Sequence, residues 1–258
     1  MNETERMRAF EEFVRVCDSM KYGEKQIIGQ GNPKSNILIV GMEPAINADD
    51  PNKEILDNIK NVQEGLKNKD EGRYCHTNHR RADFKGNHTW KVYQKLIDYI
   101  RYGHPKYEPE LNFEKDVFTT EMNNWVSKRK AIKSNNRDLF DTKLAQRRRL
   151  FEESAFIQDF PVVILACGDY IINHGDNRQI DDTFHVEFIK EYETKTKKDN
   201  SFKFWVHRNK KTDGNRLVIH TRQLSGAIPN KMLESMANVI NIWRNKESVD
   251  VIKAIINM

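Results

Sequence analysis

The chain has 258 residues and a net charge of +5, with 43 Lys and Arg against 38 Asp and Glu. This length suits one elaborated domain over residues 1–258, because no change of composition along the chain indicates a second one. Three widely spaced cysteines exclude a disulfide scaffold and a four-cysteine iron–sulfur cluster. No apolar stretch approaches the ~20 residues that a membrane span needs. We therefore expect a cytoplasmic, reducing environment and no membrane contact.

Helical patterns alternate with short, continuous apolar runs along the chain. The helical patterns begin after Thr4 and then cover roughly residues 52–69, 88–101, 143–158 and 230–257. The apolar runs, which are typical of parallel strands covered on both faces, are residues 36–41, 116–120, 161–167 and 216–220. This alternation predicts an α/β fold: a three-layer α/β/α sandwich around a central, mainly parallel four-stranded sheet.

Residues 183–208 interrupt this alternation. Apolar and polar residues alternate over 184–188 and again over 202–206, on either side of the charged segment 192–200. Such a pair of segments predicts a β-hairpin. We expect it to be an insertion at the edge of the sheet.

Basic residues gather in several short clusters, which is compatible with phosphate contacts at separated points. The alternative for each single cluster is a solvated surface. The clusters are residues 79–81, 128–130, 147–149, 195–198 and 208–211.

Three motifs follow one another in a recognisable order. A Gly-x-Gly-Asn-Pro loop at 29–33 precedes the first strand, which leads into Gly41-Met42-Glu43-Pro44-Ala45. Asp83-Phe84-Lys85-Gly86-Asn87 precedes the 88–101 helix, and His220-Thr221-Arg222-Gln223-Leu224-Ser225 follows the last strand. In this order the motifs resemble the uracil-DNA glycosylase superfamily over about residues 29–243. The lack of a cysteine quartet excludes its iron–sulfur subfamilies.

The resemblance implies a DNA glycosylase that flips a uracil-like or otherwise damaged base out of DNA and hydrolyses its N-glycosidic bond, leaving an abasic site. It implies a monomer that needs no cofactor or metal and acts on single- or double-stranded DNA. Glu43 aligns with the family's water-positioning Asp or Asn, and His220 with the donor to the departing base. The alternatives are a surface glutamate in a turn and a strand-end histidine satisfied by a backbone carbonyl.

The resemblance also implies a base pocket and a DNA-binding surface. Residues expected around the base are Gly41, Met42, Pro44, Ala45 and the stacking ring of Phe84. The base-reading Asn of the family corresponds to Glu121, with Asn123 and Asn124 as alternatives. Leu224 would be the wedge that fills the space of the flipped nucleotide, and Lys85, Arg222 and Ser225 would contact the DNA.

Departures from the family pattern bear on the substrate. Ala45 stands where most members carry Tyr or Gly, so the pocket has room for the methyl group of thymine. Thr221 replaces a Pro. An ionised Glu121 accepts hydrogen bonds but donates none, so the preferred base need not be uracil. Hydroxymethyluracil, thymine opposite guanine and a deaminated purine are the resulting candidates.

Other functions stay open at this point. Cys75-His76-Thr77-Asn78-His79 holds soft and imidazole ligands, but its spacing fits no standard zinc arrangement and favours a basic loop near DNA. No lysine lies in the catalytic motifs to form a Schiff base, so we expect attack by water. The alternatives are a catalytically inactive nucleic-acid or nucleotide binding module on the same fold, and a nucleoside or nucleotide hydrolase.

Overall fold

The computed structural model describes residues 1–19, 25–42, 51–69, 88–106, 110–123, 137–195, 200–209, 216–245 and 255. Its helices are α1 (Glu3–Ser19), α2 (Pro51–Asn68), α3 (His88–Tyr102), α5 (Arg137–Glu153), α6 (Ala155–Gln158), α7 (Gln179–Phe184) and α8 (Asn230–Arg244), with short 3-10 turns η2 (Phe113–Lys115) and η3 (Gly168–Tyr170). Its strands are β1 (Gln30–Gly31), β2 (Ile37–Gly41), β3 (Val117–Glu121), β4 (Val162–Leu165), β5 (Asn173–His174), β6 (Asn177–Arg178), β7 (Val186–Lys195), β8 (Ser201–Asn209) and β9 (Leu217–Thr221).

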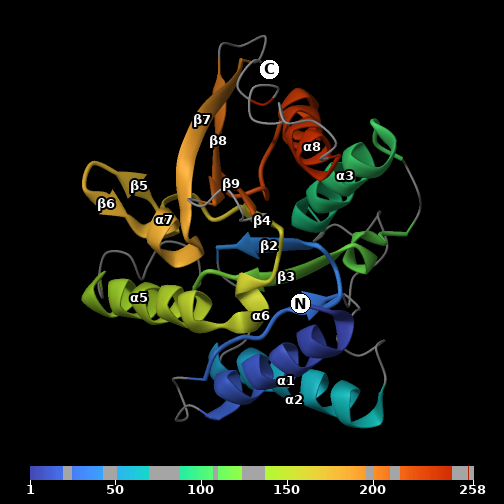
Figure 1. Cartoon of the computed structure of the whole chain (residues 1–258), viewed down its shortest axis with the longest axis vertical. Coiled ribbons are helices and arrows are strands. Elements are labelled where there is room, and N and C mark those ends of the chain that lie inside the picture. The colour runs from blue at the N-terminus through green and yellow to red at the C-terminus, as the bar shows by residue number, and fades with distance from the viewer. Residues whose placement is uncertain are drawn as a thin grey trace.

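The main sheet is mixed, with a parallel centre. Its seven strands lie in the order β1-β3-β2-β4-β9-β8-β7 (Figure 1). Strands β3, β2, β4 and β9 are parallel, as predicted, whereas β1 and the β7–β8 hairpin add antiparallel strands at the two edges. The predicted hairpin insertion is therefore confirmed, and it extends the sheet beyond the four strands expected from the apolar runs.

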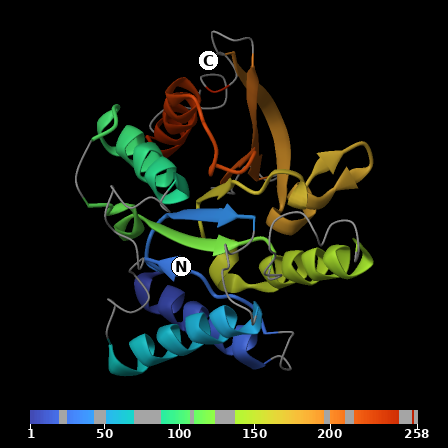
Figure 2. The same ribbon diagram turned by 180° about the vertical axis from the view of Figure 1, so that it is seen from behind.

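Both faces of the parallel strands are buried, which explains their uninterrupted apolar sequence. Leu38 and Val40 pack into a core formed with α1, α2, α5, α6 and α7. Ile37 and Ile39 point to the opposite face, into a core formed with α3 and α8. Figures 1 and 2 show these two sets of helices on opposite sides of the central strands. We call the two sides the α5 face and the α3 face.

Some element boundaries differ from those predicted. The helix expected over 143–158 begins earlier, at Arg137, and is divided at Ser154. The hydroxyl of Ser154 accepts a hydrogen bond from the Ile157 amide and so caps a new helix, α6. The hairpin strand expected from residue 184 begins at Val186, because α7 occupies the residues before it and His185 ends α7 with a left-handed φ of 55°.

The Gly-x-Gly loop is explained by close backbone packing. Gly29 and Gly31 have φ values of +114° and +105°, and β1 pairs with β3 in this loop. A Cβ atom on Gly29 would lie 2.1 Å from the Thr119 carbonyl oxygen, and one on Gly31 would lie 2.4 Å from that of Val117. Only glycine fits at both positions.

The rest of this loop is held by a buried arginine from α1. Arg6 donates to the carbonyl oxygens of Pro33 and Ser35, at 2.7 Å each, and pairs with Asp159 at 2.6 Å. Its guanidinium also lies 4.2 Å from the centre of the Phe160 ring. The loop that precedes β2 is therefore a rigid part of the fold.

None of the helices in the described ranges combines the length and the apolar character that a membrane span requires.

Candidate functional site

The carboxyl ends of β3, β2, β4 and β9 form one edge of the sheet, and the described residues of the first and last motifs, including Gly41 and His220, lie along it. Gly41 is in register with Glu121, Val40 with Leu165, and Leu165 with His220. From β2 the chain continues to β3, which lies on one side of β2 in the sheet. From β4, on the other side of β2, it continues through the hairpin to β9, so the direction of strand addition reverses between β2 and β4. In open α/β sheets such a reversal is where ligands bind. The candidate site therefore lies beyond the ends of β2 and β4.

Glu121 covers Gly41 on the α3 face of this edge. A Cβ atom on Gly41 would lie 2.2 Å from the Oε2 atom of Glu121, so the carboxylate can occupy this position only because residue 41 is glycine. The carboxylate also acts on Tyr93 of α3, whose pKa is raised well above its ordinary value by burial and then by Glu121. This side of the edge thus carries negative charge over a buried phenol.

Backbone hydrogen bonds continue between the chain segments that follow β2 and β3. The Met122 amide donates to the Gly41 carbonyl at 2.9 Å, and the Asn123 amide donates to that of Met42 at 2.8 Å. Asn123 itself is fully buried. Of the base-reading candidates within the described residues, Glu121 is therefore the more accessible one.

Arg147 holds the end of β3 from the α5 face. This side chain is fully buried and donates to the Glu121 carbonyl at 2.9 Å, the Ile27 carbonyl at 2.8 Å and the Thr120 hydroxyl at 2.7 Å. Burial lowers its pKa to about 10. The basic cluster at 147–149 is thus divided: Arg147 is internal and bonded to the protein, whereas Arg149 is exposed and pairs with Glu153.

His220 lies near the end of β9 and is almost completely buried. Its Nε2 atom is 2.8 Å from the Gly168 carbonyl oxygen, which can only accept, so Nε2 carries the proton. Burial lowers the pKa of His220, which favours a neutral ring. Trp205 stacks on this ring with centroids 5.3 Å apart and an interplanar angle of 30°. The sequence left open whether His220 faces a substrate or is satisfied by a backbone carbonyl. The hydrogen bond to Gly168 corresponds to the second alternative.

The acid and the imidazole lie on opposite faces of the sheet. Neighbouring residues of a strand point to opposite sides, and His220 shares its row with Val40 and Leu165, one residue before the row of Gly41 and Glu121. Val40 and Leu165 pack on the α5 face. A ligand that contacts both Glu121 and His220 must therefore lie across the strand ends.

The loop after β9 differs from its predicted arrangement at one residue. Leu224 is fully buried in the core of the α3 face, so the wedge role predicted for it is not supported. An apolar side chain that packs beneath α8 and α3 gains more from burial than it would gain exposed in a loop. Arg222 is exposed, with its guanidinium 5.4 Å from the Phe202 ring centre, and Ser225 is partly exposed.

Several predicted site residues lie outside the described residues. They are Glu43, Pro44, Ala45, Phe84, Lys85 and Asn124. The possible zinc segment at 75–79 is outside as well. Within the described ranges, no group of three or more His, Cys, Asp or Glu side chains could hold a metal ion.

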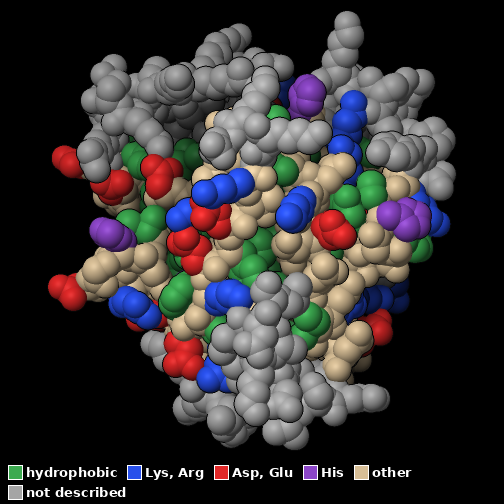
Figure 3. All heavy atoms as spheres, turned by 90° about the horizontal axis from the view of Figure 1, so that it is seen from above, with side chains coloured by type: hydrophobic (Ala, Val, Ile, Leu, Met, Phe, Trp, Pro, Cys, Tyr) green, Lys and Arg blue, Asp and Glu red, His purple; other side chains and the backbone are tan. Residues whose placement is uncertain are grey.

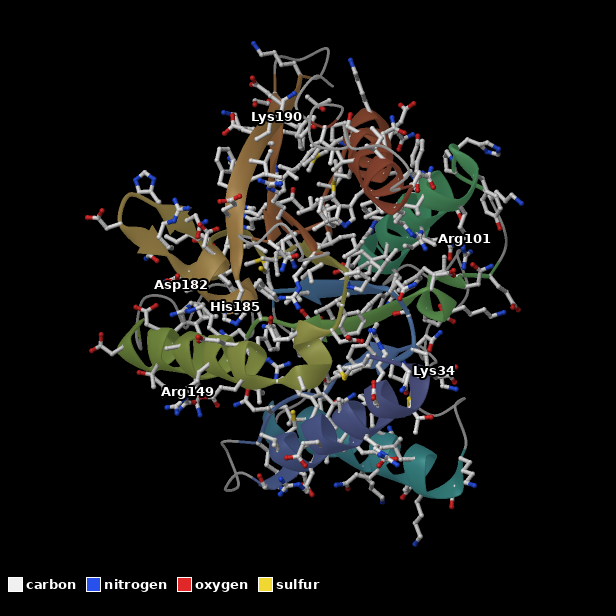
Figure 4. All side chains as sticks on the ribbon, in the orientation of Figure 1. Lys34, Arg101, Arg149, Asp182, His185 and Lys190 are labelled. Atoms are coloured by element: carbon white, nitrogen blue, oxygen red, sulfur yellow. The ribbon has the colours of Figure 1, made fainter. Side chains whose placement is uncertain are left out.

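Charge on the described surface is mixed. Basic and acidic side chains alternate over the face seen in Figure 3, where residues outside the described set cover part of the view. Lys34, Arg101, Arg149 and Lys190 project from different elements around the molecule (Figure 4). These four cations do not gather into one patch.

Sequence reasoning missed a buried polar group beside the site. His207 on β8 is 1% exposed, as is Asp181 on α7, and the His207 Nδ1 atom lies 3.2 Å from Asp181 Oδ1. Burial lowers the pKa of His207 to about 4, despite the nearby carboxylate. In the sequence, the alternation of Trp205 and His207 along β8 was the signal that could have identified this group, since both side chains point to the α5 face with His220.

The chain matches no protein-family model, and a comparison with curated proteins found no significant similarity.

Proposed function

We propose that this chain is a DNA glycosylase that removes a uracil-like or otherwise damaged base by attack of water. The observation that carries the proposal is that β2 and β9, which lead into the first and last motifs, end at the same edge with only β4 between them. The proposal includes a three-layer α/β/α sandwich, supported by the two cores on opposite faces of the sheet.

The proposed reaction separates charge between the sugar and the base. Water adds to the anomeric carbon while the N-glycosidic bond breaks, and the bonding electron pair leaves with the base. Glu43 accepts a proton from the water, and the departing base anion is protonated by solvent. A carboxylate near the sugar stabilises the oxocarbenium-like transition state, and a donor near the base stabilises its developing negative charge.

His220 would supply that donor as a neutral ring. Its pKa is lowered by burial, so it remains uncharged at neutral pH. For Nε2–H to donate to the base, an oxygen of the base has to replace the Gly168 carbonyl as acceptor. Glu121, beside Gly41, would accept hydrogen bonds from the donor groups of the base and so select it.

The experiment uses duplex and single-stranded oligonucleotides that each carry one uracil, hydroxymethyluracil or hypoxanthine. After incubation with the protein, alkali cleaves the strand wherever a base has been removed. We expect strand cleavage on at least one substrate, and Glu43→Gln and His220→Ala should each lower the rate by roughly two to four orders of magnitude with DNA affinity largely retained. Absence of cleavage on every substrate would refute the proposal, and equal rates in both variants would refute the assigned residues.

A non-catalytic nucleic-acid binding module is the second candidate. It is favoured by the burial of Leu224 and by the hydrogen bond that already occupies Nε2 of His220. The same assay separates the two functions, because a binding module retains affinity that falls steeply with salt but removes no base. A nucleoside hydrolase would instead show little dependence on salt and would act on free nucleosides.

A further inference from the structure

The hairpin lies directly against the strand that carries the last motif. Strand β8 pairs antiparallel with β9, with Trp205 opposite His220 and Phe204 opposite Thr221. The Thr221 hydroxyl also donates to the Lys203 carbonyl at 3.2 Å. The insertion is therefore hydrogen-bonded to the strand that leads into the last motif.

Trp205 is a partly exposed aromatic ring held in one orientation. It stacks on His220, and its indole N–H donates to Glu191 on the neighbouring strand at 2.8 Å. Glu191 is itself paired with Lys203 at 2.6 Å. Such a ring loses little conformational freedom when a planar ligand stacks on it.

The opposite face of the hairpin contacts the same motif loop. Phe202 lies beneath the guanidinium of Arg222, at 5.4 Å, while Arg222 stays exposed. The hairpin thus carries the Trp205 ring on one face and contacts an exposed cation from the other, and both groups flank the end of β9. Proteins that bind unpaired nucleic acid combine these two groups, with bases on the rings and phosphates on the cations.

We propose that the β7–β8 hairpin is an element for binding unpaired DNA, in which Trp205 stacks on a base and Arg222 holds a neighbouring phosphate. The inference rests on the proposed function and adds a substrate form to it: single-stranded or locally unpaired DNA. A base within a duplex has both faces stacked, so it offers no free face to Trp205. Stacking accepts every base, so the hairpin contributes affinity without sequence preference.

The test measures binding of a labelled single-stranded oligonucleotide and of its duplex by fluorescence anisotropy. Trp205→Ala should weaken single-strand affinity about 5- to 100-fold and change duplex affinity less than about twofold. Trp205→Phe keeps an aromatic ring and should retain affinity within about threefold. Phe188→Ala removes an exposed aromatic residue elsewhere on the same hairpin and should bind as the parent does.

Two further readouts separate stacking from charge and remain usable if Trp205→Ala fails to fold. The dependence of log affinity on log salt should be unchanged in Trp205→Phe and smaller by about one in Arg222→Ala. Single-stranded DNA should quench tryptophan fluorescence in the parent, and most of this quenching should be lost in Trp205→Phe.

The outcomes distinguish this inference from the proposed function. If the parent removes bases but Trp205→Ala binds single strands as well as the parent does, the hairpin inference is wrong and the glycosylase proposal stands. Equal quenching in the parent and Trp205→Phe also overturns the inference alone. If the parent binds no oligonucleotide even at low salt, both proposals fail.

Discussion

The two faces of the sheet carry different chemistry where the parallel strands end. On the α3 face, the Glu121 carboxylate covers Gly41 and helps to raise the pKa of the buried Tyr93. On the α5 face, His220 and His207 are buried and burial lowers the pKa of each. At this edge the Glu121 carboxyl group and the neutral His220 ring thus lie on opposite faces, and His207 lies further into the sheet, opposite Val218 on β9. The two kinds of group are separated because neighbouring side chains of a strand point to opposite faces of the sheet, and not because the residues are far apart in the sequence.

The largest expected effect is on the α5 face, at Arg147. Arg147→Met should lower the free energy of unfolding by about 3–5 kcal/mol, because it leaves the carbonyls of Ile27 and Glu121 without their buried donor. Urea unfolding measures this change. Arg149→Met on the exposed side of the same helix is the control and should cost less than about 0.5 kcal/mol. Similar losses in the two variants would show that Arg147 does not hold the end of β3.

Leu224 tests whether the loop after β9 belongs to the α3-face core. Leu224→Ala should lower the free energy of unfolding by about 2–5 kcal/mol, since it removes buried methyl groups and leaves a cavity. Ser225→Ala at the next position, which is partly exposed, should change stability little. If Leu224→Ala instead kept full stability and lost only activity, the residue would be an exposed wedge.

His207 should make stability depend on pH. Its folded pKa is about 4, whereas histidine in an unfolded chain titrates near ~6.5. Between these values the unfolded chain binds more protons, so the free energy of unfolding should fall as pH decreases from about 6.5 to about 4. The contribution is on the order of 3 kcal/mol and is fully present above the unfolded pKa.

Urea unfolding of parent and His207→Asn at several pH values between these limits measures this contribution. Asparagine keeps a donor for Asp181, so the variant should show a flatter dependence on pH than the parent. His185→Asn is the matched control, because His185 is exposed and asparagine tolerates its left-handed backbone. Parallel pH profiles for the parent and His207→Asn would contradict the assignment.

The smallest expected effect on stability is at Gly41. Gly41→Ala brings a Cβ atom against the end of the Glu121 side chain, which can rotate away, so the variant should lose less than about 1 kcal/mol. The displaced carboxylate should nevertheless change which base the protein prefers.

Gly29→Ala is the contrast. Its Cβ atom meets a backbone oxygen at a positive φ, so the free energy of unfolding should fall by about 3 kcal/mol or more. If Gly41→Ala kept the base preference of the parent, Glu121 would not be the residue that selects the base.

Much of the fold could be predicted because its signals are local. The runs at 36–41 and 216–220 are apolar without interruption, and both became parallel strands within a residue or so. The alternating segments around 192–200 became the hairpin. The burial of Arg147 could not be predicted, since its neighbours Arg148 and Arg149 look the same in sequence. Its partners are backbone atoms about 26 and 120 residues away, brought close only by the assembled sheet.

By itself the sequence determined the four parallel strands, the hairpin and the long helices, and that Gly41, Glu121 and His220 follow or end parallel strands, because hydrophobic periodicity reports burial one element at a time. The tertiary structure alone decided which face each side chain occupies, that Leu224 belongs to the core, and that Trp205 stacks on His220. These properties depend on strand order and register, which are set by packing between segments far apart in the chain.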